Sequence, residues 1–305
     1  MGRTFSCLAA GVIHVFSFKE TLKYSSPRRR PGSSALNFLD SGFRRNDERA
    51  RNRRLSDKEG RWALGVFCVL AAAPALADGG WVGRFPSAGD FPPPPWRVER
   101  LDERVPPTRY GLRVWDGVAA VEAQANKSMA LFGRPLEIDL QKTPFLCWQW
   151  RIDAPVASAD MAQKSGDDYA ARVYLTFNVP PGQLGVLTRA GLALARSIYG
   201  NQVPDAALNY IWDNRHPVGT VQANAYTDRA RMLVLRSGGD LAGGWVTERR
   251  NVLEDYRLAF GDMGGQLRGL AIASDTDNTG EEAHAGFADF RFVATAGECP
   301  APSGG

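Results

Sequence analysis

The stretch SDTDNTGEE at residues 274–282 places four carboxylates, an asparagine and two threonines within nine positions. Such an oxygen-rich loop can hold Ca²⁺, which accepts irregular cages of carboxylate and carbonyl oxygens. The EF-hand spacing is not met, because its twelfth position requires a bidentate glutamate and falls on Gly286. A looser structural calcium site of Asp275, Asp277 and Asn278 is one expectation. A catalytic or ligand-contacting acid cluster is another, and a solvated or backbone-capping turn is the preferred interpretation.

Two adjacent carboxylates, Asp167 and Asp168, precede a strand-like run that begins near Arg172. They could bind Ca²⁺, orient a sugar hydroxyl or supply a base, although neighbours along an extended strand point to opposite faces. A polar turn with one aspartate capping backbone groups is the preferred interpretation. The candidate ligand contacts in this region are Asp167, Asp168, Arg172 and Tyr174.

Basic residues alternate along the segment at 226–231, so that Arg229 and Arg231 share one face of an expected strand. Guanidinium groups on a polar sheet face can fork onto carboxylates or phosphates. A structural ion-pair network with Asp228, Glu254 and Asp255 is preferred here. The alternative is ligand binding, and its candidates are Tyr226, Asp228, Arg229 and Arg231.

Aromatic side chains that stack on sugar rings are a further possibility. Trp148 and Trp150 share a face with Leu146 in a strongly hydrophobic strand, so we expect them in the core. Trp212 and Tyr210 have polar neighbours and are the better stacking candidates.

Period-two alternation predicts the strands that position these residues. In RVYLTFNV (172–179) the odd-numbered residues are apolar and the even-numbered ones are polar, which is typical of a half-buried strand. The segments at 109–115 and 118–125 flank Asp116-Gly117, a strong hairpin signal. Further strands are expected at 145–151, 231–236, 267–273 and 287–293.

Helical spacing occurs in TRAGLALARSIYG (188–200), inside an insertion at about 184–216. Many short strands with one helical insertion predict an all-β fold, a β-sandwich of jelly-roll type. We expect a Pro-rich lead-in at 78–100, a single sandwich domain at 101–295 and a flexible tail at 296–305.

The front of the chain differs in charge from the remainder. Residues 1–77 hold 14 Lys and Arg against 6 Asp and Glu, whereas the remainder holds 23 against 27. The body therefore gives no electrostatic reason to expect nucleic acid. Residues 51–77 combine basic residues, an apolar run and Ala75-Leu76-Ala77, as in a secretory signal, and the run is too short to span a membrane. Residues 1–50 are expected to be disordered or to precede the true translation start.

Cleavage near Ala77 would deliver the mature chain to the periplasm or the medium, with no membrane span. Its two cysteines, Cys147 and Cys299, would then meet an oxidising compartment, and their pairing is left open. Two cysteines and two histidines without close spacing give no zinc signature.

From about Leu101 to Val293 the chain resembles the bacterial domain-of-unknown-function family numbered 3047. The resemblance rests on LCWQWRID, KSGDDYAARVYLTF, AYTDRARMLVLRSG, RRNVLEDYRLAFG and AIASDTDNTGEEAHAGFADFRF, in that order. The family has no established activity, so the resemblance implies a fold and an exported context. The last strand is also similar to that of galactose-binding-like jelly rolls.

Two functions remain open. The preferred one is an exported, non-enzymatic binding module for a carbohydrate or cell-envelope glycan. The alternative is an envelope polysaccharide hydrolase or lyase that uses an acid from Asp168, Asp275 or Asp277, with Arg172 or Arg231 stabilising negative charge. Serine-nucleophile, phosphate-loop and dinucleotide motifs are absent from the sequence, which favours binding.

Overall fold

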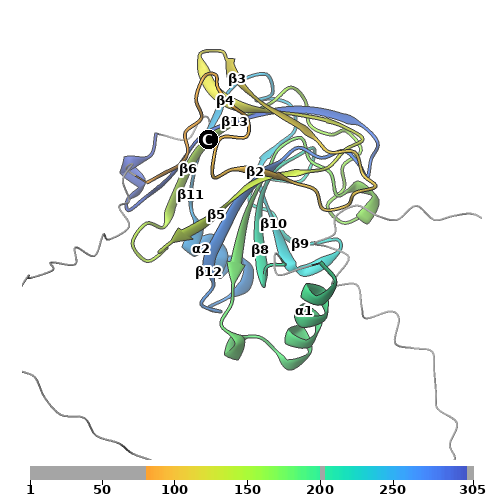
Figure 1. The fold of residues 1–305 in the computed structure, drawn as a ribbon, viewed down its shortest axis with the longest axis vertical. Coiled ribbons are helices and arrows are strands. Elements are labelled where there is room, and N and C mark those ends of the chain that lie inside the picture. Colours follow the sequence, from red (N-terminus) through yellow and green to blue (C-terminus); the bar gives the residue numbers. More distant parts are fainter. Residues whose placement is uncertain (1–79, 200–202, 301–305) are drawn as a thin grey trace, which may run out of the picture. The chain divides into compact units, whose positions relative to one another are not determined.

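The computed structural model describes residues 80–199 and 203–300 (Figure 1). Within these ranges the chain forms two β-sheets and two α-helices. The extension expected at 1–50 and the signal peptide expected at 51–77, with its cleavage near Ala77, lie outside the described residues. The end of the expected tail, residues 301–305, lies outside them as well.

The first sheet has six strands. Its hydrogen-bonded order is β11-β6-β13-β4-β3, and β1 pairs with β13 beside this path. All of its strand pairs are antiparallel. The predicted hairpin is present: Asp116 and Gly117 form the turn between β3 and β4, with φ angles of 51° and 83°. The strands are β1 (Trp81–Gly83), β3 (Arg109–Trp115), β4 (Val118–Asn126), β6 (Phe145–Ile152), β11 (Val246–Asn251) and β13 (Glu282–Val293).

The second sheet has seven strands in the order β2-β5-β12-β7-β8-β10-β9. The β8–β10 pair is parallel, and the other pairs are antiparallel. The strands are β2 (Arg97–Glu99), β5 (Leu131–Ile138), β7 (Arg172–Asn178), β8 (Ala206–Asp213), β9 (Val221–Asn224), β10 (Thr227–Ser237) and β12 (Gln266–Ala273). Strands β1 and β2 lie within the segment expected as a lead-in.

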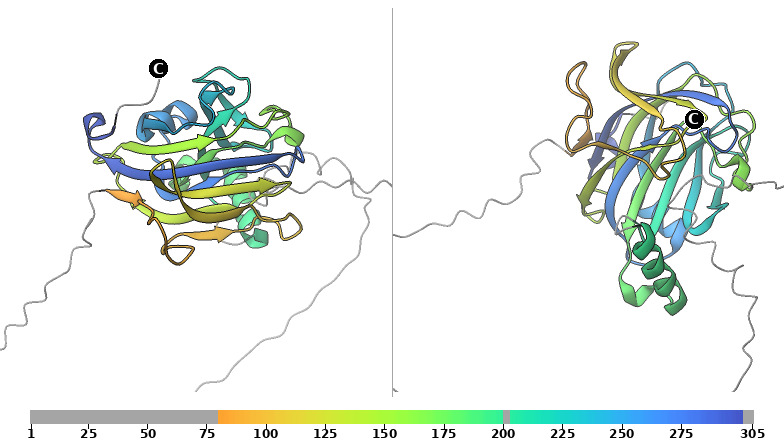
Figure 2. Two further views of the ribbon diagram at one scale, coloured as in Figure 1. Left: turned by 90° about the horizontal axis from the view of Figure 1, so that it is seen from above. Right: turned by 45° about the vertical axis from the view of Figure 1, so that its right-hand side comes forward.

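The inner faces of the two sheets share one core, so the sheets form a sandwich (Figure 2). Val173, Leu175 and Phe177 on β7 are fully buried, as their alternation predicts. From the other sheet Trp148 stacks on Tyr210 with 5.4 Å between ring centroids. The predicted fold class, an all-β sandwich of jelly-roll type, is confirmed, and so is the core position predicted for Trp148.

Two helices accompany the sheets. Helix α1 (Val186–Tyr199) lies in the predicted insertion, which also holds the fully buried strand β8. Helix α2 (Val252–Phe260) begins after Asn251, whose side chain accepts a hydrogen bond from the backbone N–H of Glu254. Gly261 follows it with a φ of 72°, a conformation that favours glycine. Short 3₁₀-helices lie at Lys164–Gly166 (η2), Pro181–Gln183 (η3) and Ala296–Glu298 (η4).

Trp212 and Tyr210, expected as exposed stacking platforms, are instead core residues of β8, and that prediction is wrong. They are 1% and 0% exposed. The Trp212 indole donates to the backbone oxygen of Gly238, and the Tyr210 hydroxyl donates to Asp255. A central strand covered on both faces buries its aromatic residues regardless of the polar residues beside them in sequence.

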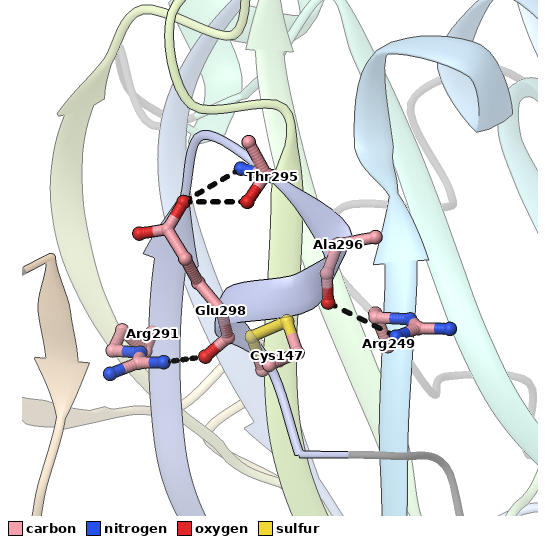
Figure 3. Close-up of a disulfide and its surroundings, with 7 residues drawn as sticks. Cys147, Arg249, Arg291, Thr295, Ala296 and Glu298 are labelled. Atoms are coloured by element: carbon pink, nitrogen blue, oxygen red, sulfur yellow. Dashed lines mark hydrogen bonds between the residues drawn. A yellow bond between two sulfur atoms is a disulfide. The ribbon is translucent and has the colours of Figure 1, made fainter.

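Cys147 and Cys299 form a disulfide that joins β6 to the segment after η4, across 152 residues of chain (Figure 3). The surrounding tail is held by further bonds. Arg249 donates to the backbone oxygen of Ala296 at 3.0 Å, and Arg291 donates to that of Glu298. The pairing that the sequence left open is therefore present, and the start of the expected flexible tail is attached to the sheet.

None of the helices in the described part of the chain is long and apolar enough to cross a membrane.

Candidate functional site

A cleft of about 540 Å³ lies on the outer face of the seven-stranded sheet. Along β7 the even-numbered residues Tyr174, Thr176 and Asn178 line it, whereas the odd-numbered residues pack into the core. The polar strand face that the alternation predicts is therefore part of a cleft. Strands β2, β5, β8, β9, β10 and β12 also contribute to the lining, so the cleft extends across the sheet.

Small residues on neighbouring strands form the floor of the cleft. Gly133 on β5 pairs with Ala271 on β12, and a Cβ at Gly133 would lie 3.1 Å from the Cβ of Ala271. Gly269 pairs with Thr176, whose Oγ1 would lie 2.7 Å from a Cβ at Gly269. Larger side chains would occupy this space, so glycine and alanine leave the cleft open.

Tyr174 and Asn209 are register partners on β7 and β8, and both line the cleft. Asn209 is 1% exposed, yet its Oδ1 has no hydrogen-bond partner in the described part of the chain. A buried polar atom without a partner costs about 1–3 kcal/mol. A ligand hydroxyl that donates to Asn209 would offset that cost.

Arg172 is a buried cation at the start of β7, 1% exposed. Its Nη1 donates to Oδ2 of Asp275 at 2.5 Å and to the backbone oxygen of Asp167 at 3.2 Å. Its guanidinium also lies 4.7 Å from the ring of Tyr169 and 4.9 Å from that of Tyr174. Burial acts to lower the pKa of Arg172, but the charges of Asp275 and Asp167 raise it well above its ordinary value, so Arg172 stays charged.

Asp167 is enclosed beside this arginine. Asn224 on β9 donates to its Oδ2 at 2.9 Å, and Arg172 lies 3.4 Å from its Oδ1. Burial raises the pKa of Asp167, and the charge of Arg172 opposes that rise. Asp167, Arg172 and Asn224 therefore form one polar wall of the cleft.

Asp168 anchors the loop that contains SDTDNTGEE. Its Oδ1 accepts from the backbone N–H and the side-chain amide of Asn278, and its Oδ2 accepts from the backbone N–H of Thr279 at 2.6 Å. On the other side of the loop the Tyr226 hydroxyl donates to Oδ1 of Asn278 at 2.9 Å and to the backbone oxygen of Lys164. Asp168 is thus the backbone-capping aspartate that the sequence favoured, and Tyr226 holds the loop from outside the cleft.

Three carboxylates converge at this loop. Asp168, Asp275 and Asp277 each offer an oxygen, and these oxygens lie within 4.8 Å of one another. Burial raises the pKa of Asp277 to about 7, and the charge of Asp168 adds to the rise. Burial likewise raises the pKa of Asp275 well above its ordinary value, against the pull of Arg172. Of the predicted metal ligands, Asp275 and Asp277 meet here, and Asp168 is the third carboxylate. The third predicted ligand, Asn278, instead uses its side-chain amide in hydrogen bonds with Asp168 and Tyr226.

The remaining predicted ligand residues do not form one surface. Asp228 is exposed and is not among the residues that line the cleft. Arg229 borders the cleft, but its Nε donates to the backbone oxygen of Asp205 at 2.7 Å and its guanidinium lies 5.9 Å from the ring of Phe260. Arg231 is absent from the lining as well, and Trp212 is in the core.

The ion-pair network expected for these arginines is not formed. Among the described residues, Arg229 and Arg231 have no carboxylate within 4.0 Å, and Nη2 of Arg229 and Nε of Arg231 are buried without a hydrogen-bond partner. Asp255, one of the expected partners, instead accepts from Arg250 at 2.5 Å and from Tyr210. Arg250 lies on β11, two residues before α2 begins, which brings it within reach of Asp255 on the first turn of the helix.

Sequence reasoning missed Asn209 and Asn224 as cleft residues. Asn209 sits in the run AALNYIWD, every residue of which is buried, so no alternation marked its orientation. Asn224 lies on a four-residue edge strand that was not predicted. Thr176 and Asn178 carried a usable signal, because they continue the polar face of Arg172 and Tyr174.

Solved structures similar to this chain include carbohydrate-active proteins. A family 30 carbohydrate-binding module is 8% identical over 65% of this chain and 80% of that chain, with a TM-score of 0.31. The xyloglucanase domain of NopAA, a type three effector from Sinorhizobium fredii in complex with cellobiose, is 9% identical over 66% and 93%, with a TM-score of 0.35. The endoglucanase Cel12A from Rhodothermus marinus is 13% identical over 71% and 97%, with a TM-score of 0.36.

A comparison of this sequence with curated proteins found no match. The family described as "Protein of unknown function (DUF3047)" matches residues 94–291. This range begins just before β2, ends within β13 and contains every residue that lines the cleft. The resemblance seen in the five sequence motifs is therefore confirmed, and the chain belongs to the DUF3047 family.

Proposed function

We propose that this protein binds a neutral glycan in the cleft of the seven-stranded sheet. The observation that carries the proposal is the cleft itself, about 540 Å³ in volume, with a floor of small residues and the unpartnered Oδ1 of Asn209 in its wall. Small-molecule sites in proteins have volumes of about 300–1,000 Å³ and contain a few polar groups that orient the ligand.

The chemistry of the lining matches that of a sugar. Tyr174, Thr176, Asn178 and Asn209 present hydroxyl and amide groups, which both donate and accept hydrogen bonds, as sugar hydroxyls do. Tyr174 adds an aromatic ring with a polar end, which suits a ligand with apolar and polar faces. These four residues lie on the adjacent strands β7 and β8, so they can contact one bound ligand together.

A neutral glycan is favoured over a polyanion because four of the six arginines that line the cleft already form ion pairs with carboxylates. Ion pairs join Arg97 to Glu99, Arg100 to Glu103, Arg172 to Asp275 and Arg268 to Glu137, while Arg134 and Arg229 donate to backbone carbonyls. At the four paired arginines, a uronate or a phosphate would have to displace a carboxylate before it could form bidentate bonds with the guanidinium.

The carboxylates support binding more than hydrolysis. Glycosidases place two carboxyl groups on either side of the scissile bond, about 5 to 10 Å apart. Asp168, Asp275 and Asp277 instead gather their oxygens within 4.8 Å of one another at a single loop. Both oxygens of Asp168 are also engaged by that loop.

We further propose that the protein acts outside the cytoplasm, in the periplasm or as a secreted protein. The Cys147–Cys299 disulfide supports an oxidising compartment. The signal sequence expected at 51–77 supports export. Western blots of periplasmic and cytoplasmic fractions test this part, and a full-length product confined to the cytoplasm would contradict it.

Isothermal titration calorimetry with neutral and uronic-acid oligosaccharides tests the binding proposal. A neutral oligosaccharide should bind, and Tyr174→Ala should raise its Kd by about 30-fold, since a central aromatic contact contributes about 2 kcal/mol. Asp228→Asn changes an exposed residue outside the cleft and should leave the Kd unchanged. Failure of every oligosaccharide to bind, or a product peak after incubation with one of them, would contradict the proposal.

A further inference from the structure

The loop beside the cleft buries more negative than positive charge. Asp167, Asp168 and Asp275 are 2%, 0% and 2% exposed, and Asp277 lies among them. Arg172 is the one cation within ion-pair distance of these four carboxylates in the part of the chain that the structure describes. Burial of ionised carboxylates without compensation is strongly unfavourable, so a further positive charge is required if they are ionised.

Several oxygens at this point have no hydrogen-bond donor. Oδ1 of Asp275 and both carboxylate oxygens of Asp277 are inaccessible to solvent and without a partner among the described residues. The side chain of Asp275 is 2% exposed, and its other oxygen is used by Arg172. The hydroxyl of Tyr169, a residue that is 1% exposed, is unpartnered too, and the charge of Asp275 acts on it. The chain leaves a set of buried acceptors that a cation would satisfy.

We propose that Asp168, Asp275 and Asp277 bind one divalent cation, and that this cation is Ca²⁺. Ca²⁺–oxygen distances are about 2.3–2.6 Å, so two oxygens on one ion lie at most about 5 Å apart. The three carboxylates meet this condition with oxygens within 4.8 Å of one another. All three donors are hard oxygens, and this set has no histidine or cysteine that would favour zinc or copper. Ca²⁺ is preferred to Mg²⁺ because it accepts irregular geometry and more ligands.

The cation would link segments that are distant in sequence. Asp168 precedes β7, whereas Asp275 and Asp277 follow β12. Asp168 keeps capacity for a metal through Oδ2, which accepts one hydrogen bond, from Thr279, and has a second lone pair, whereas Oδ1 accepts two bonds from Asn278. Asp275 and Asp277 also line the cleft, so the ion would fix the cleft wall.

This inference goes beyond glycan binding and stands without it, because its first test needs no sugar. The purified full chain is stripped with EDTA and then titrated with CaCl₂ in a calorimeter, with thermal unfolding recorded in parallel. We expect one Ca²⁺ per chain. At Ca²⁺ near 100 times Kd the melting temperature should rise by about 5 to 10 °C. MgCl₂ should give a smaller rise.

Asp277→Asn removes a ligand whose carboxylate has no hydrogen-bond partner among the described residues, so the variant should fold and lose the Ca²⁺ response. Asp228→Asn is the matched control, and it should keep the full response. If Asp277→Asn does not fold, Tb³⁺ luminescence of the wild-type protein, excited through tyrosine, replaces it and should rise on binding and fall on addition of Ca²⁺.

Three results would overturn the proposal: no heat and no shift of the melting temperature with millimolar Ca²⁺, equal responses in Asp277→Asn and Asp228→Asn, or Tb³⁺ luminescence that Ca²⁺ does not reduce. The first result would mean that protons on the carboxyl groups provide the compensation. Glycan titrations in Ca²⁺ and in EDTA then separate the two proposals, because a metal-free protein that still binds sugar leaves the proposed function intact.

Discussion

The guanidinium of Arg172 donates from Nη1 to Oδ2 of Asp275 at 2.5 Å, and both side chains are 2% exposed. The pair joins the start of β7 to the loop after β12, although the two residues are 103 positions apart in sequence. Strands β7 and β12 are hydrogen-bonded neighbours, which brings Arg172 opposite Ala273 and close to Asp275. The ion pair therefore positions the acidic loop at one end of the cleft.

Loss of the arginine from this pair should strongly destabilise the fold. Arg172→Met leaves Asp167 and Asp275 buried without their cation, and breaking a buried pair in this way costs about 3–5 kcal/mol. Urea unfolding in EDTA measures the change in the free energy of unfolding. The control is Arg113→Met. The Arg113 side chain is 42% exposed and forms an ion pair with Glu122, which the substitution removes. It should cost less than about 1 kcal/mol, and equal losses in the two variants would contradict the prediction.

The disulfide should contribute to stability because it closes a loop of 152 residues. Replacement of both cysteines, Cys147→Ser with Cys299→Ser, should lower the free energy of unfolding by about 2–5 kcal/mol, since the unfolded chain gains freedom. Chemical denaturation of the two proteins measures the difference. A reducing agent should destabilise the wild-type protein and leave the double variant unchanged, and a wild-type protein insensitive to reduction would count against the prediction.

A side chain added to the cleft floor should block the ligand and spare the fold. Ala271 is 9% exposed and lies between Gly133 and Tyr174 in the sheet, so Ala271→Leu projects into the cleft. We expect glycan affinity to fall by at least about 10-fold, or 1.4 kcal/mol, with little change in melting temperature. Ala88→Leu, at an exposed alanine outside the cleft, is the control. Unchanged affinity in Ala271→Leu would place the glycan site elsewhere.

Acid should weaken the six-stranded sheet through Glu122. Burial acts to raise the pKa of Glu122. Hydrogen bonds from Arg113 and His284 outweigh burial and hold this pKa below its ordinary value of 4.5. A carboxylate with a lowered folded-state pKa adds stability above its unfolded-state pKa, and this is lost as the pH falls through the folded-state pKa. The melting temperature should therefore drop between about pH 6 and pH 3, and it should drop less in Glu122→Gln.

The matched control for this experiment is Glu137→Gln, whose side chain is 88% exposed. It should show the same pH dependence as the wild-type protein. A Glu122→Gln variant with an undiminished drop would assign the acid sensitivity to other carboxylates.

The fold was predictable where one face of a strand meets water. Thr176 alternates with core residues, so β7 and its polar face could be read from the sequence, and the turn at Asp116-Gly117 marked a hairpin. Strand β8 was not predictable, because it is buried on both faces and shows no alternation. The polar residues of β8 suggested that Tyr210 and Trp212 were exposed. Instead, Asn209 faces the cleft, and Asp213 accepts hydrogen bonds from two backbone N–H groups of the following turn.

The residue types of the candidate site were predictable, but their convergence was not. Asp168 and Asn278 are 110 residues apart and meet only because β7 pairs with β12. Local sequence patterns carry no information about such a pairing. The ion pair of Asp255 is different, because its partner Arg250 lies only five residues earlier, at the junction of β11 and α2.

The central positions of β12 and β13 set an order on folding. Strand β12 lies between β5 and β7, and β13 lies between β4 and β6, so the middle of each sheet is filled by one of the last two strands in the described part of the chain. Before these strands arrive, their flanking partners have no direct hydrogen bonds across the gap, which is about two strand spacings wide, near 9.6 Å. In a ribosome-bound chain that stops before residue 266, the pairings of the native sheets are therefore limited to four separate groups of strands, and β1 has no partner. Both sheets close only after residues 266–293 have been synthesised, so the separate parts of each sheet cannot join before then.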